Sequence, residues 1–475
     1  MAKGETYTLS LDQGGHASRA LVFDQDGRLR ASAECTIRTR TQGRLRVEHA
    51  PQALLASLRK AAEAALARLP KRAEVGAAAL ATQRSSIACW DRHDGRALSP
   101  VISWQDRRAL RQVAALAPHT QEIRALTGLV LSPHYGASTL AWCLKHLAPV
   151  RQAQRQGRLA AGPLASFIVA NLLIEQPCVA DPVNGGRTQL LDVQRGAWSP
   201  RLCEIFGVPS DVLPDCVPNA HPFGHLVAGG RRIPLTVATG DQPAALFALG
   251  TPQADTAYVN LGTGAFVQRP AAADAPGLLH SLIWRSVDES LYALEGTVNG
   301  AGAALAWASA RSRFPLKKAL GLLPTWLASA KEPPLFLNGV GGLGAPYWRP
   351  LFRSRFIGRG GKPEKMTAVL ESVVFLLMEN LTRMQQAEAP IRRLVATGGH
   401  AQIDALCQRL ADLSGLPLAR PELHEATALG AARLTGGITA PAAPIETAFT
   451  PKSDAALHRR YALWREAMRE ALDEE

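Results

Sequence analysis

The chain has 475 residues, more than one growing hydrophobic core usually holds, so two domains are expected. Apolar residues make up 47% of the chain and charged residues 20%, a composition that excludes a largely disordered protein. The net charge is +13, but the basic residues are dispersed and form no run of like charges that would bind nucleic acid. We therefore expect a globular enzyme without a nucleic-acid partner.

The seven cysteines are widely spaced, odd in number and never form a CxxC pair, which is typical of reduced thiols. The N-terminal residues 1–8 are polar and lack the apolar centre of a signal peptide. The longest apolar stretch, residues 167–174, is too short to span a bilayer. These features predict a cytoplasmic protein with no membrane partner.

The first half of the chain opens with two apolar strands, Tyr7–Leu11 and Ala20–Asp24, followed by a turn at Gln25–Gly27 and a returning strand. An antiparallel meander is therefore expected at the start of a mixed α/β domain, which we place at residues 1–249. Helical and apolar patterns then alternate, as helices at Pro51–Arg68 and Ala137–Leu147 and strands at Val75–Ala81 and Leu235–Ala238.

The second half repeats the opening theme, because strand Thr256–Leu261 is followed by the turn Gly262–Gly264 and another apolar run, Ala265–Gln268. This repetition predicts a second domain of similar topology at residues 250–440. The later patterns are a glycine loop at 339–344, a helix at 365–386, a strand at 393–397, a helix at 402–414, and a tail at 441–475 with an amphipathic surface helix.

Three familiar sequence signatures of binding sites are incomplete or absent. Gly339, Gly341 and Gly344 match GxGxxG, but Pro346 follows where a dinucleotide-binding fold needs a helix. The pair His424-Glu425 lacks the second histidine of a zinc-binding HExxH helix, and no Walker A sequence occurs.

What remains is a set of glycine-bearing turns next to acidic or hydroxyl residues. Each of them alone is more often a plain tight turn than a site. Together they suggest a clamp, because glycine allows backbone N–H groups of two hairpins to approach the phosphates of a nucleotide. The turns are Asp12–Gly14, Gly240–Gln242, Gly262–Gly264 and Gly398-Gly399.

Phosphoryl transfer also needs an acidic residue near Mg²⁺ and a base for the attacking hydroxyl. Asp12 ends an apolar strand, where its carboxylate can meet a hydrated Mg²⁺, although a turn-forming aspartate is the plainer interpretation. Asp241 follows a strand and Gly240, with Pro243 in the first turn of a helix, so its carboxylate is expected at a helix N-terminus. An ordinary N-cap is the alternative for Asp241.

In its motifs the chain resembles the FGGY carbohydrate kinase family, and within it the glycerol kinase branch. The matching runs stand in family order and cover residues from about 5 to 440. They are Leu11–Gly14, Ser18–Ala20, Glu48–Pro51, Gln83-Arg84, Trp104–Arg108, Gly240–Phe247, Leu261–Gly264, Glu295-Gly296, Gly342–Trp348, Leu370–Ser372, Gly398-Gly399 and Glu425–Ala432.

The resemblance implies two ribonuclease H-like domains of the actin-like ATPase architecture with a cleft between them. It implies that the first domain binds the acceptor alcohol and the second binds the nucleotide. ATP is the implied phosphoryl donor, Mg²⁺ the implied metal, and a small polyol or sugar the implied acceptor. It also makes a homodimer or homotetramer the expected assembly.

Individual roles follow from the resemblance alone. Asp241 is the implied catalytic base, and Asp12 is the implied second catalytic residue and metal-associated acid. The acceptor is expected to contact Arg84, Ser85, Trp104, His134, Gln242 and Phe266. The nucleotide is expected to contact Gly14, Gly15, His16, Arg19, Gly262, Thr263, Gly302, Gly398, Gly399 and Ile403.

The sequence also departs from the family pattern. Gly15 and His16 replace two threonines of the phosphate hairpin, which removes hydroxyl donors but keeps a backbone N–H and a ring that can donate. Ser85 stands where the family has a glutamate that accepts a substrate hydroxyl, and His134 stands where it has a tyrosine. On the nucleotide side the departures are Thr397 for an aspartate, Ile403 for an asparagine and Ala306 for a glutamine.

Three hypotheses follow. The first is a carbohydrate kinase whose acceptor is larger than glycerol or differently oriented. The second, motivated by Gly15, His16 and Ser85, is a regulatory homologue that binds nucleotide or sugar without transferring phosphate. The third is a chaperone-like ATPase, against which the run Gly342–Trp348 argues.

Overall fold

The computed structural model describes residues 6–43, 45–329, 332–423, 425–440 and 445–474. The chain divides into two compact units, which are described separately. Unit 1 contains residues 1–251, 281–292 and 424–442, and unit 2 contains residues 252–280, 293–423 and 443–475. Residues 281–292 and 424–440, which the sequence placed in the second domain, therefore group with unit 1.

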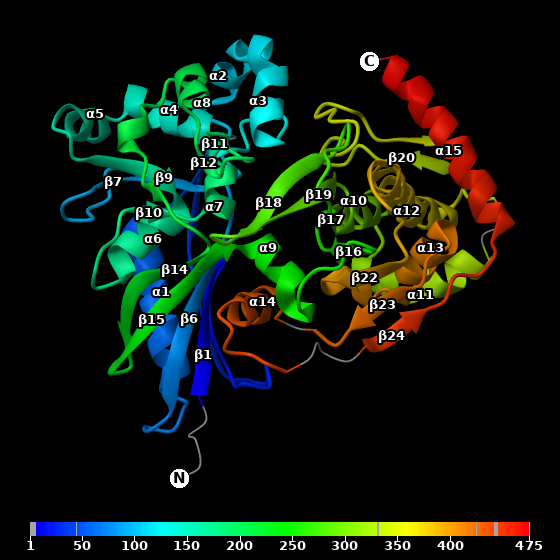
Figure 1. The fold of residues 1–475 in the computed structure, drawn as a ribbon. Coiled ribbons are helices and arrows are strands. Elements are labelled where there is room, and N and C mark those ends of the chain that lie inside the picture. Colours follow the sequence, from blue (N-terminus) through cyan, green and yellow to red (C-terminus); the bar gives the residue numbers. More distant parts are fainter. Residues whose placement is uncertain (1–5, 44, 330–331, 424, 441–444, 475) are drawn as a thin grey trace. The chain divides into compact units, whose positions relative to one another are not determined.

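The main sheet of unit 1 has six strands in the order β14-β15-β6-β1-β2-β3 (Figure 1). Strands β1, β2 and β3 form the predicted antiparallel meander, whereas β6 and β15 run parallel to β1. The bounds are β1 Thr6–Gln13, β2 Ala17–Phe23, β3 Leu29–Thr36, β6 Glu74–Thr82, β14 Ala220–Ala228 and β15 Arg231–Gly240.

The two faces of this sheet have different coverings because side chains alternate along a strand. Leu9 and Leu11 of β1 belong to the core under helix α1 (Pro51–Leu66). That helix begins with Pro51 at its first turn and ends two residues before the predicted Arg68. Helices α9 (Asp241–Leu246) and α14 (Ala426–Leu434) cover the opposite face (Figure 1). This face carries Asp12, which is in register with Ala81.

The remaining elements of unit 1 surround a second sheet with the strand order β4-β5-β8-β7-β9 and two short pairs, β10 with β13 and β11 with β12. The strands are β4 Thr39–Gln42, β5 Arg46–His49, β7 Ile87–Asp91, β8 Val101–Ile102, β9 Leu159–Pro163, β10 Val179–Ala180, β11 Leu191–Asp192, β12 Ala197–Trp198 and β13 Asp215–Cys216. The helices are α2 Leu110–Ala115, α3 Thr120–Thr127, α4 Gly136–His146, α5 Ala148–Arg155, α6 Leu164–Leu172, α7 Pro182–Gly186 and α8 Pro200–Phe206, with 3₁₀ turns at Ala117–His119, Ser210–Val212 and Phe247–Leu249.

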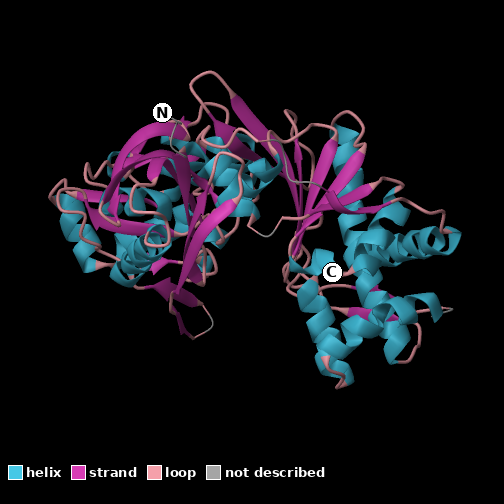
Figure 2. Ribbon diagram, turned by 90° about the horizontal axis from the view of Figure 1, so that it is seen from below, coloured by secondary structure: helices cyan, strands magenta, loops and turns pink. Residues whose placement is uncertain are grey.

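A seven-stranded sheet has the order β18-β19-β17-β16-β22-β23-β24. Strands β17, β16, β22, β23 and β24 belong to unit 2, whereas residues 281–285 of β18 and 290–292 of β19 group with unit 1. Figure 2 shows the strands in magenta and the helices in cyan. Strand β16 is followed by antiparallel β17, has parallel β22 on its other side, and is followed outward by parallel β23 and antiparallel β24. Because β1, β2, β6, β15 and β14 have the same order and directions, the predicted repetition of topology is confirmed.

The strands of this sheet and of the short pair β20 with β21 are β16 Thr256–Leu261, β17 Ala265–Pro270, β18 Leu279–Arg285, β19 Ser290–Val298, β20 Leu335–Leu337, β21 Arg355–Ile357, β22 Arg393–Thr397, β23 Leu418–Pro421 and β24 Ile445–Phe449. The helices are α10 Gly302–Ser312, α11 Leu316–Ser329, α12 Lys362–Ala387, the 3₁₀ helix η4 Gly399–Gln402, α13 Asp404–Ser414 and α15 Ala455–Asp473. The predicted helix 402–414 thus begins at Asp404, after η4.

The C-terminal helix α15 is amphipathic, as predicted, and its apolar face completes the core of unit 2. Trp464 is fully buried, and its indole Nε1 donates to the Phe336 carbonyl at 2.9 Å. Arg460 donates to buried Glu371 of α12 at 2.6 Å, and the Tyr461 hydroxyl donates to Glu379 at 2.6 Å. The tail is therefore an integral layer of unit 2.

Gly430 fixes how closely α14 packs on α9, the helix that begins with Asp241. A Cβ atom at Gly430 would lie 1.8 Å from the Ala244 carbonyl oxygen, so Gly430→Ala must push the helices apart. We expect a loss of about 1–3 kcal/mol in the free energy of unfolding, measured by urea-induced unfolding. Gly321→Ala in α11 is the matched control, because nothing lies within 4 Å of its Cβ position and alanine favours a helix. Equal unfolding midpoints for the two variants would contradict this account.

Candidate active site

The two predicted catalytic aspartates both belong to unit 1 and lie at the carboxyl ends of its parallel strands. Strands β1 and β15 flank β6, and Asp12 and Thr239 are both in register with Ala81. Asp241 follows Thr239 by two residues and is the first residue of α9. The two carboxyls are close enough that Asp241 raises the pKa of Asp12.

Asp12 lies within β1, so the interpretation as a turn-forming aspartate is wrong. Its side chain is 3% exposed, and its Oδ2 accepts a hydrogen bond at 2.5 Å from Arg19, its cross-strand neighbour. Arg19 also donates to Glu425 at 2.8 Å. Burial raises the pKa of Asp12 to about 6, although the Arg19 guanidinium lowers it. Arg19 thus holds two carboxylates at the edge of the sheet.

Asp241 is the first helical residue of α9, and Gly240 takes the N-cap position, so the N-cap interpretation of Asp241 is wrong. Its Oδ1 accepts the backbone N–H of Gln242 at 2.8 Å and lies 3.9 Å from Arg84 Nε. Burial raises the pKa of Asp241, while Arg84 and Arg187 lower it. A third of the side chain is still exposed, which leaves the carboxyl open to a reactant.

Arg84 lies across the junction between β15 and α9. A Cβ at Gly240 would come within 2.6 Å of the Arg84 side chain, so only glycine allows this approach. The guanidinium donates to Gln242 Oε1. The structure therefore brings three of the predicted site residues, Arg84, Asp241 and Gln242, into direct contact.

The predicted acceptor residues Ser85, Trp104 and His134 also belong to unit 1. The ring centres of Trp104 and His134 lie 5.3 Å apart, and the backbone N–H of Trp104 donates to the Ser86 hydroxyl at 3.1 Å. Ser85 has a positive φ of 66° and a buried hydroxyl without a hydrogen-bond partner among the described residues. Serine rarely adopts this backbone conformation, and such conformations cluster at functional sites.

The remaining acceptor candidate, Phe266, lies on β17 in unit 2 and not with the other five. Its contribution to the acceptor site stays a prediction.

The predicted phosphate hairpin of unit 1 joins β1 to β2 and is held from several sides. The Gly14 N–H donates to Ala17 at 3.0 Å, and Gln83 Nε2 donates to the Gly14 carbonyl at 3.2 Å. The carbonyls of Gly15 and His16 accept from Thr39 Oγ1 at 3.3 Å and the Ile37 N–H at 2.9 Å. The His16 side chain is exposed at the tip.

The predicted nucleotide residues of unit 2 converge on the turn between β16 and β17. The Gly302 N–H donates to the Gly262 carbonyl at 3.0 Å, and the Ala303 N–H donates to Thr263 at 2.9 Å. Gly398 has a φ of 92°, and a Cβ there would lie 2.5 Å from the Leu261 carbonyl oxygen. The N-terminus of α10 and the double glycine thus meet the same turn.

Sequence reasoning missed His400, which belongs to this group. A Cβ at Gly302 would lie 2.4 Å from His400 Cε1, so the ring packs directly on the glycine. Burial lowers the pKa of His400, and its carbonyl accepts the N–H of the predicted Ile403 at 3.1 Å. The available signal was its position directly after Gly398-Gly399.

In unit 1 the missed residues are Glu425, Arg187 and Thr239. Glu425 lies in a matched motif, but its ion pair with Arg19 joins positions 406 residues apart and leaves no local pattern. Its neighbour His424 lies outside the described residues. Arg187 follows α7 and is buried, and its sequence surroundings carry no motif.

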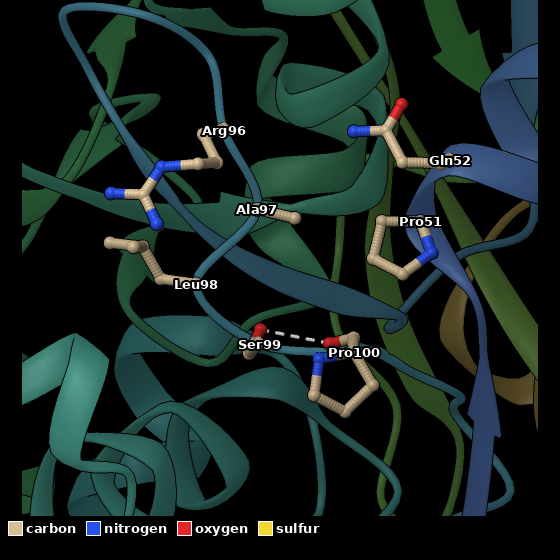
Figure 3. A pocket seen from close by; sticks show the side chains of 7 residues that line it. All are labelled: Pro51, Gln52, Arg96, Ala97, Leu98, Ser99 and Pro100. Carbon is tan, nitrogen blue, oxygen red and sulfur yellow. Dashed lines mark hydrogen bonds between the residues drawn. The ribbon is translucent and has the colours of Figure 1, made fainter.

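An open pocket of about 430 Å³ lies elsewhere in unit 1, where the N-terminus of α1 meets the segment before β8 (Figure 3). Its lining residues are Pro51, Gln52, Arg96, Ala97, Leu98, Ser99 and Pro100. None of the predicted site residues lines it.

No cluster of three or more histidine, cysteine or acidic side chains capable of binding a metal occurs within the described ranges. Mg²⁺ commonly binds one or two carboxylates together with substrate phosphates. A single buried oxygen ligand, Asp12, at the carboxyl ends of parallel strands fits that mode. Among the described helices, none has both the length and the apolar composition that crossing a membrane requires.

Two units of matching topology, each with a glycine hairpin, define the class of two-domain proteins with ribonuclease H-like domains of the actin-like ATPase architecture. Residues 7–248 match the N-terminal domain model of the FGGY family of carbohydrate kinases, and residues 257–437 match its C-terminal domain model. The chain therefore belongs to the FGGY family of carbohydrate kinases.

Named relatives agree with this assignment. The chain is 34% identical to the glycerol kinase of Trichlorobacter lovleyi over 453 residues, which cover 91% of this chain and 90% of the relative. It is 35% identical to that of Thermus brockianus over 447 residues, with coverage of 90% and 89%. The Plasmodium falciparum glycerol kinase with ADP has the same fold, with a TM-score of 0.91, 22% identity and 99% of both chains covered. A gluconate kinase from Lactobacillus acidophilus aligns with a TM-score of 0.87 at 18% identity, again over 99% of both chains.

Removal of the Arg19 guanidinium tests the electrostatics of this site. A carboxyl whose folded pKa is raised contributes stability below its ordinary value of 3.8 and loses it as the pH rises through about 6. Because Arg19 lowers this pKa, Arg19→Met should extend the loss to higher pH. We expect a cost of about 1–3 kcal/mol at pH 7.5, measured by urea-induced unfolding, and a smaller cost at pH 4.5.

Arg28→Met is the control, because the Arg28–Asp26 pair is exposed and should contribute less than about 1 kcal/mol at either pH. A loss for Arg19→Met that does not depend on pH would show that Arg19 acts only through packing.

Proposed function

We propose that this protein transfers the γ-phosphoryl group of ATP to a hydroxyl group of a small polyol or sugar. The observation that carries the proposal is Asp241, a partly exposed carboxyl with a raised pKa, next to Arg84 and Gln242 and close to Asp12. Membership of the FGGY family and the glycerol kinase relatives support it. Both acidic residues that the reaction needs are present, which favours catalysis over a purely regulatory role.

Asp241 is the base in this proposal, and it accepts the proton of the attacking hydroxyl. A carboxylate with a raised pKa is a stronger base than an ordinary one, which suits proton abstraction near neutral pH. Arg84 and Gln242 orient the hydroxyl groups of the acceptor, since they contact each other and adjoin Asp241. The ring pair of Trp104 and His134 forms an aromatic wall for the carbon skeleton.

Asp12, with Arg19 holding one of its oxygens, is the proposed metal-associated carboxylate. Bound Mg²⁺ and ATP would supply the phosphoryl group and neutralise charge that develops on its oxygens. Gly14, Gly15 and His16 of unit 1 would bind phosphate, as would Gly262 and Thr263 of unit 2. Gly302, Gly398, Gly399 and Ile403 would lie near the rest of the nucleotide.

We further propose that residues 1–249 bind the acceptor, residues 250–440 bind the nucleotide, and closure between them excludes water from the γ-phosphate. The acceptor itself depends on Ser85, whose short hydroxyl replaces the longer carboxylate of the family pattern. Losing such a partner costs about 1–3 kcal/mol for a buried hydroxyl group, enough to change which polyol binds best. A homo-oligomer in the cytoplasm completes the proposal.

Asp241→Asn should lower acceptor-dependent ADP release by about 10²- to 10⁴-fold, because the amide cannot accept the proton. The assay couples ADP release to a panel of glycerol, larger polyols, pentuloses and sugar acids. Nucleotide affinity, measured by calorimetry, should stay close to wild type. Asp211→Asn, at an exposed carboxyl, is the control and should leave turnover unchanged. A wild-type protein that binds nucleotide but turns over no acceptor would instead support the regulatory homologue.

The pH dependence of kcat/KM for the best acceptor provides an independent check. Asp241 must be ionised to act as a base, so activity should fall as the pH falls through its raised pKa. We therefore expect the acidic limb above the ordinary aspartate value of about 3.9. Because Asp12 and Asp241 interact, the limb reports the pair. Full activity maintained down to pH 4 would be inconsistent with Asp241 as the base.

A further inference from the structure

Thr239 is a buried residue at the carboxyl end of β15, two positions before Asp241. Its side chain has no exposed surface, and its Oγ1 has no hydrogen-bond partner among the described residues. Buried polar groups nearly always have a partner in the protein or in ordered water, so an exception calls for an explanation. No motif and no role assigned above accounts for this hydroxyl.

The sheet register places Thr239 in one row with Asp12. Ala81 of β6 is in register with Asp12 on one side and with Thr239 on the other. Ala81 and Val237 both pack toward α9 and α14, and Thr239 follows Val237 by two residues, so it lies on the same face. Asp12, Ala81 and Thr239 therefore form one row, with the smallest side chain at its centre.

The spacing of this row suits a bridging water molecule. Neighbouring strands lie about 4.8 Å apart, so the Cα atoms of Asp12 and Thr239 are separated by about 10 Å. Two short side chains cannot close that distance by a direct hydrogen bond. A hydrated divalent cation, with its metal–oxygen distances of about 2.1 Å, or a water molecule can lie between them.

Arg19 determines which side of Asp12 is available. Strand β2 lies beside β1 on the side opposite β6, and Arg19 binds Asp12 Oδ2 from there. The other carboxylate oxygen is not bound by Arg19, and Ala81 and Thr239 lie on the side of Asp12 opposite β2. Ser10, one row earlier and opposite Ala79, has a second buried hydroxyl without a partner among the described residues. This face of the sheet therefore has unused hydrogen-bonding capacity next to the carboxylate.

We propose that Thr239 is a positioning residue whose hydroxyl hydrogen-bonds a water molecule in the hydration shell of the divalent cation at Asp12. The inference rests on the proposed function, because it presupposes a metal–nucleotide complex at Asp12. Mg²⁺ gives up its water reluctantly and usually keeps several molecules when bound, so a hydroxyl at this distance can orient one of them. Partners of this outer kind commonly change metal affinity 10- to 100-fold when removed.

The test compares Thr239→Val, which keeps the shape but removes the hydroxyl, with Thr239→Ser, which keeps the hydroxyl. Calorimetry on the full chain measures the affinity for Mn²⁺–ADP and for ADP in EDTA, and the ratio of the two reports the contribution of the metal. We expect Thr239→Val to reduce this ratio by about tenfold and Thr239→Ser to leave it within about threefold of wild type. The affinity for metal-free ADP should not change.

Thr367→Val is the matched control. Thr367 is also a buried threonine whose hydroxyl has no partner among the described residues, but it lies on α12 in unit 2. Its substitution should leave the ratio unchanged. Thr239→Ala provides a second variant without the hydroxyl should Thr239→Val fail to fold, which a thermal melt will show.

A ratio for Thr239→Val and Thr239→Ala equal to that of wild type would overturn the inference while leaving the proposed function intact. If wild-type protein bound Mn²⁺–ADP no more tightly than ADP and transferred phosphate to no acceptor, the metal site and the proposed function would both fail. A tenfold loss restricted to the variants that lack the hydroxyl would establish Thr239 as the positioning residue.

Discussion

The candidate site depends on a carboxylate that is buried at the edge of the sheet where the parallel strands end. Asp12 is almost completely buried, and a charge in that position is costly unless a partner compensates it. Arg19 provides that partner from the adjacent strand, and Glu425 holds Arg19 in turn. This ion pair fixes the position of the carboxylate and offsets part of the rise in pKa that burial causes.

The parallel arrangement of β1, β6 and β15 explains why the candidate site residues of unit 1 gather where they do. Parallel strands present their carboxyl ends at one edge, and the residues that follow them meet there. Asp12, Gln83, Arg84 and Asp241 are all at or just beyond such an end. In unit 2, Gly262, Gly398 and His400 likewise follow the carboxyl ends of β16 and β22. They lie at or next to the turn between β16 and β17.

Most of the architecture could be predicted from the sequence, because alternating apolar residues and glycine turns are local signals. The meander, the repeated hairpin and the helix starting at Asp241 were of this kind. The alternative interpretations of Asp12 as a turn residue and of Asp241 as an N-cap were wrong for local reasons: β1 continues through Asp12, and Gly240 occupies the cap.

Other features could not be predicted because they join distant parts of the chain. The pairing of Arg19 with Glu425 and the packing of His400 on Gly302 leave no periodicity in the sequence. The row of Asp12, Ala81 and Thr239 requires the register of three strands, which spacing along the chain does not give. The grouping of residues 424–442 with unit 1 could not be predicted either, because the sequence has no boundary signal there.

The grouping of residues 424–442 with unit 1 affects biosynthesis. Helix α14 covers the face of the unit 1 sheet that carries Asp12, and it follows most of unit 2 in the chain. The meander and β6 can form early, but this face of the sheet has only the short helix α9 as a cover until α14 has been translated. A nascent chain that stalls in unit 2 would therefore expose the apolar side chains of Ala79, Ala81 and Val237 to chaperones and proteases.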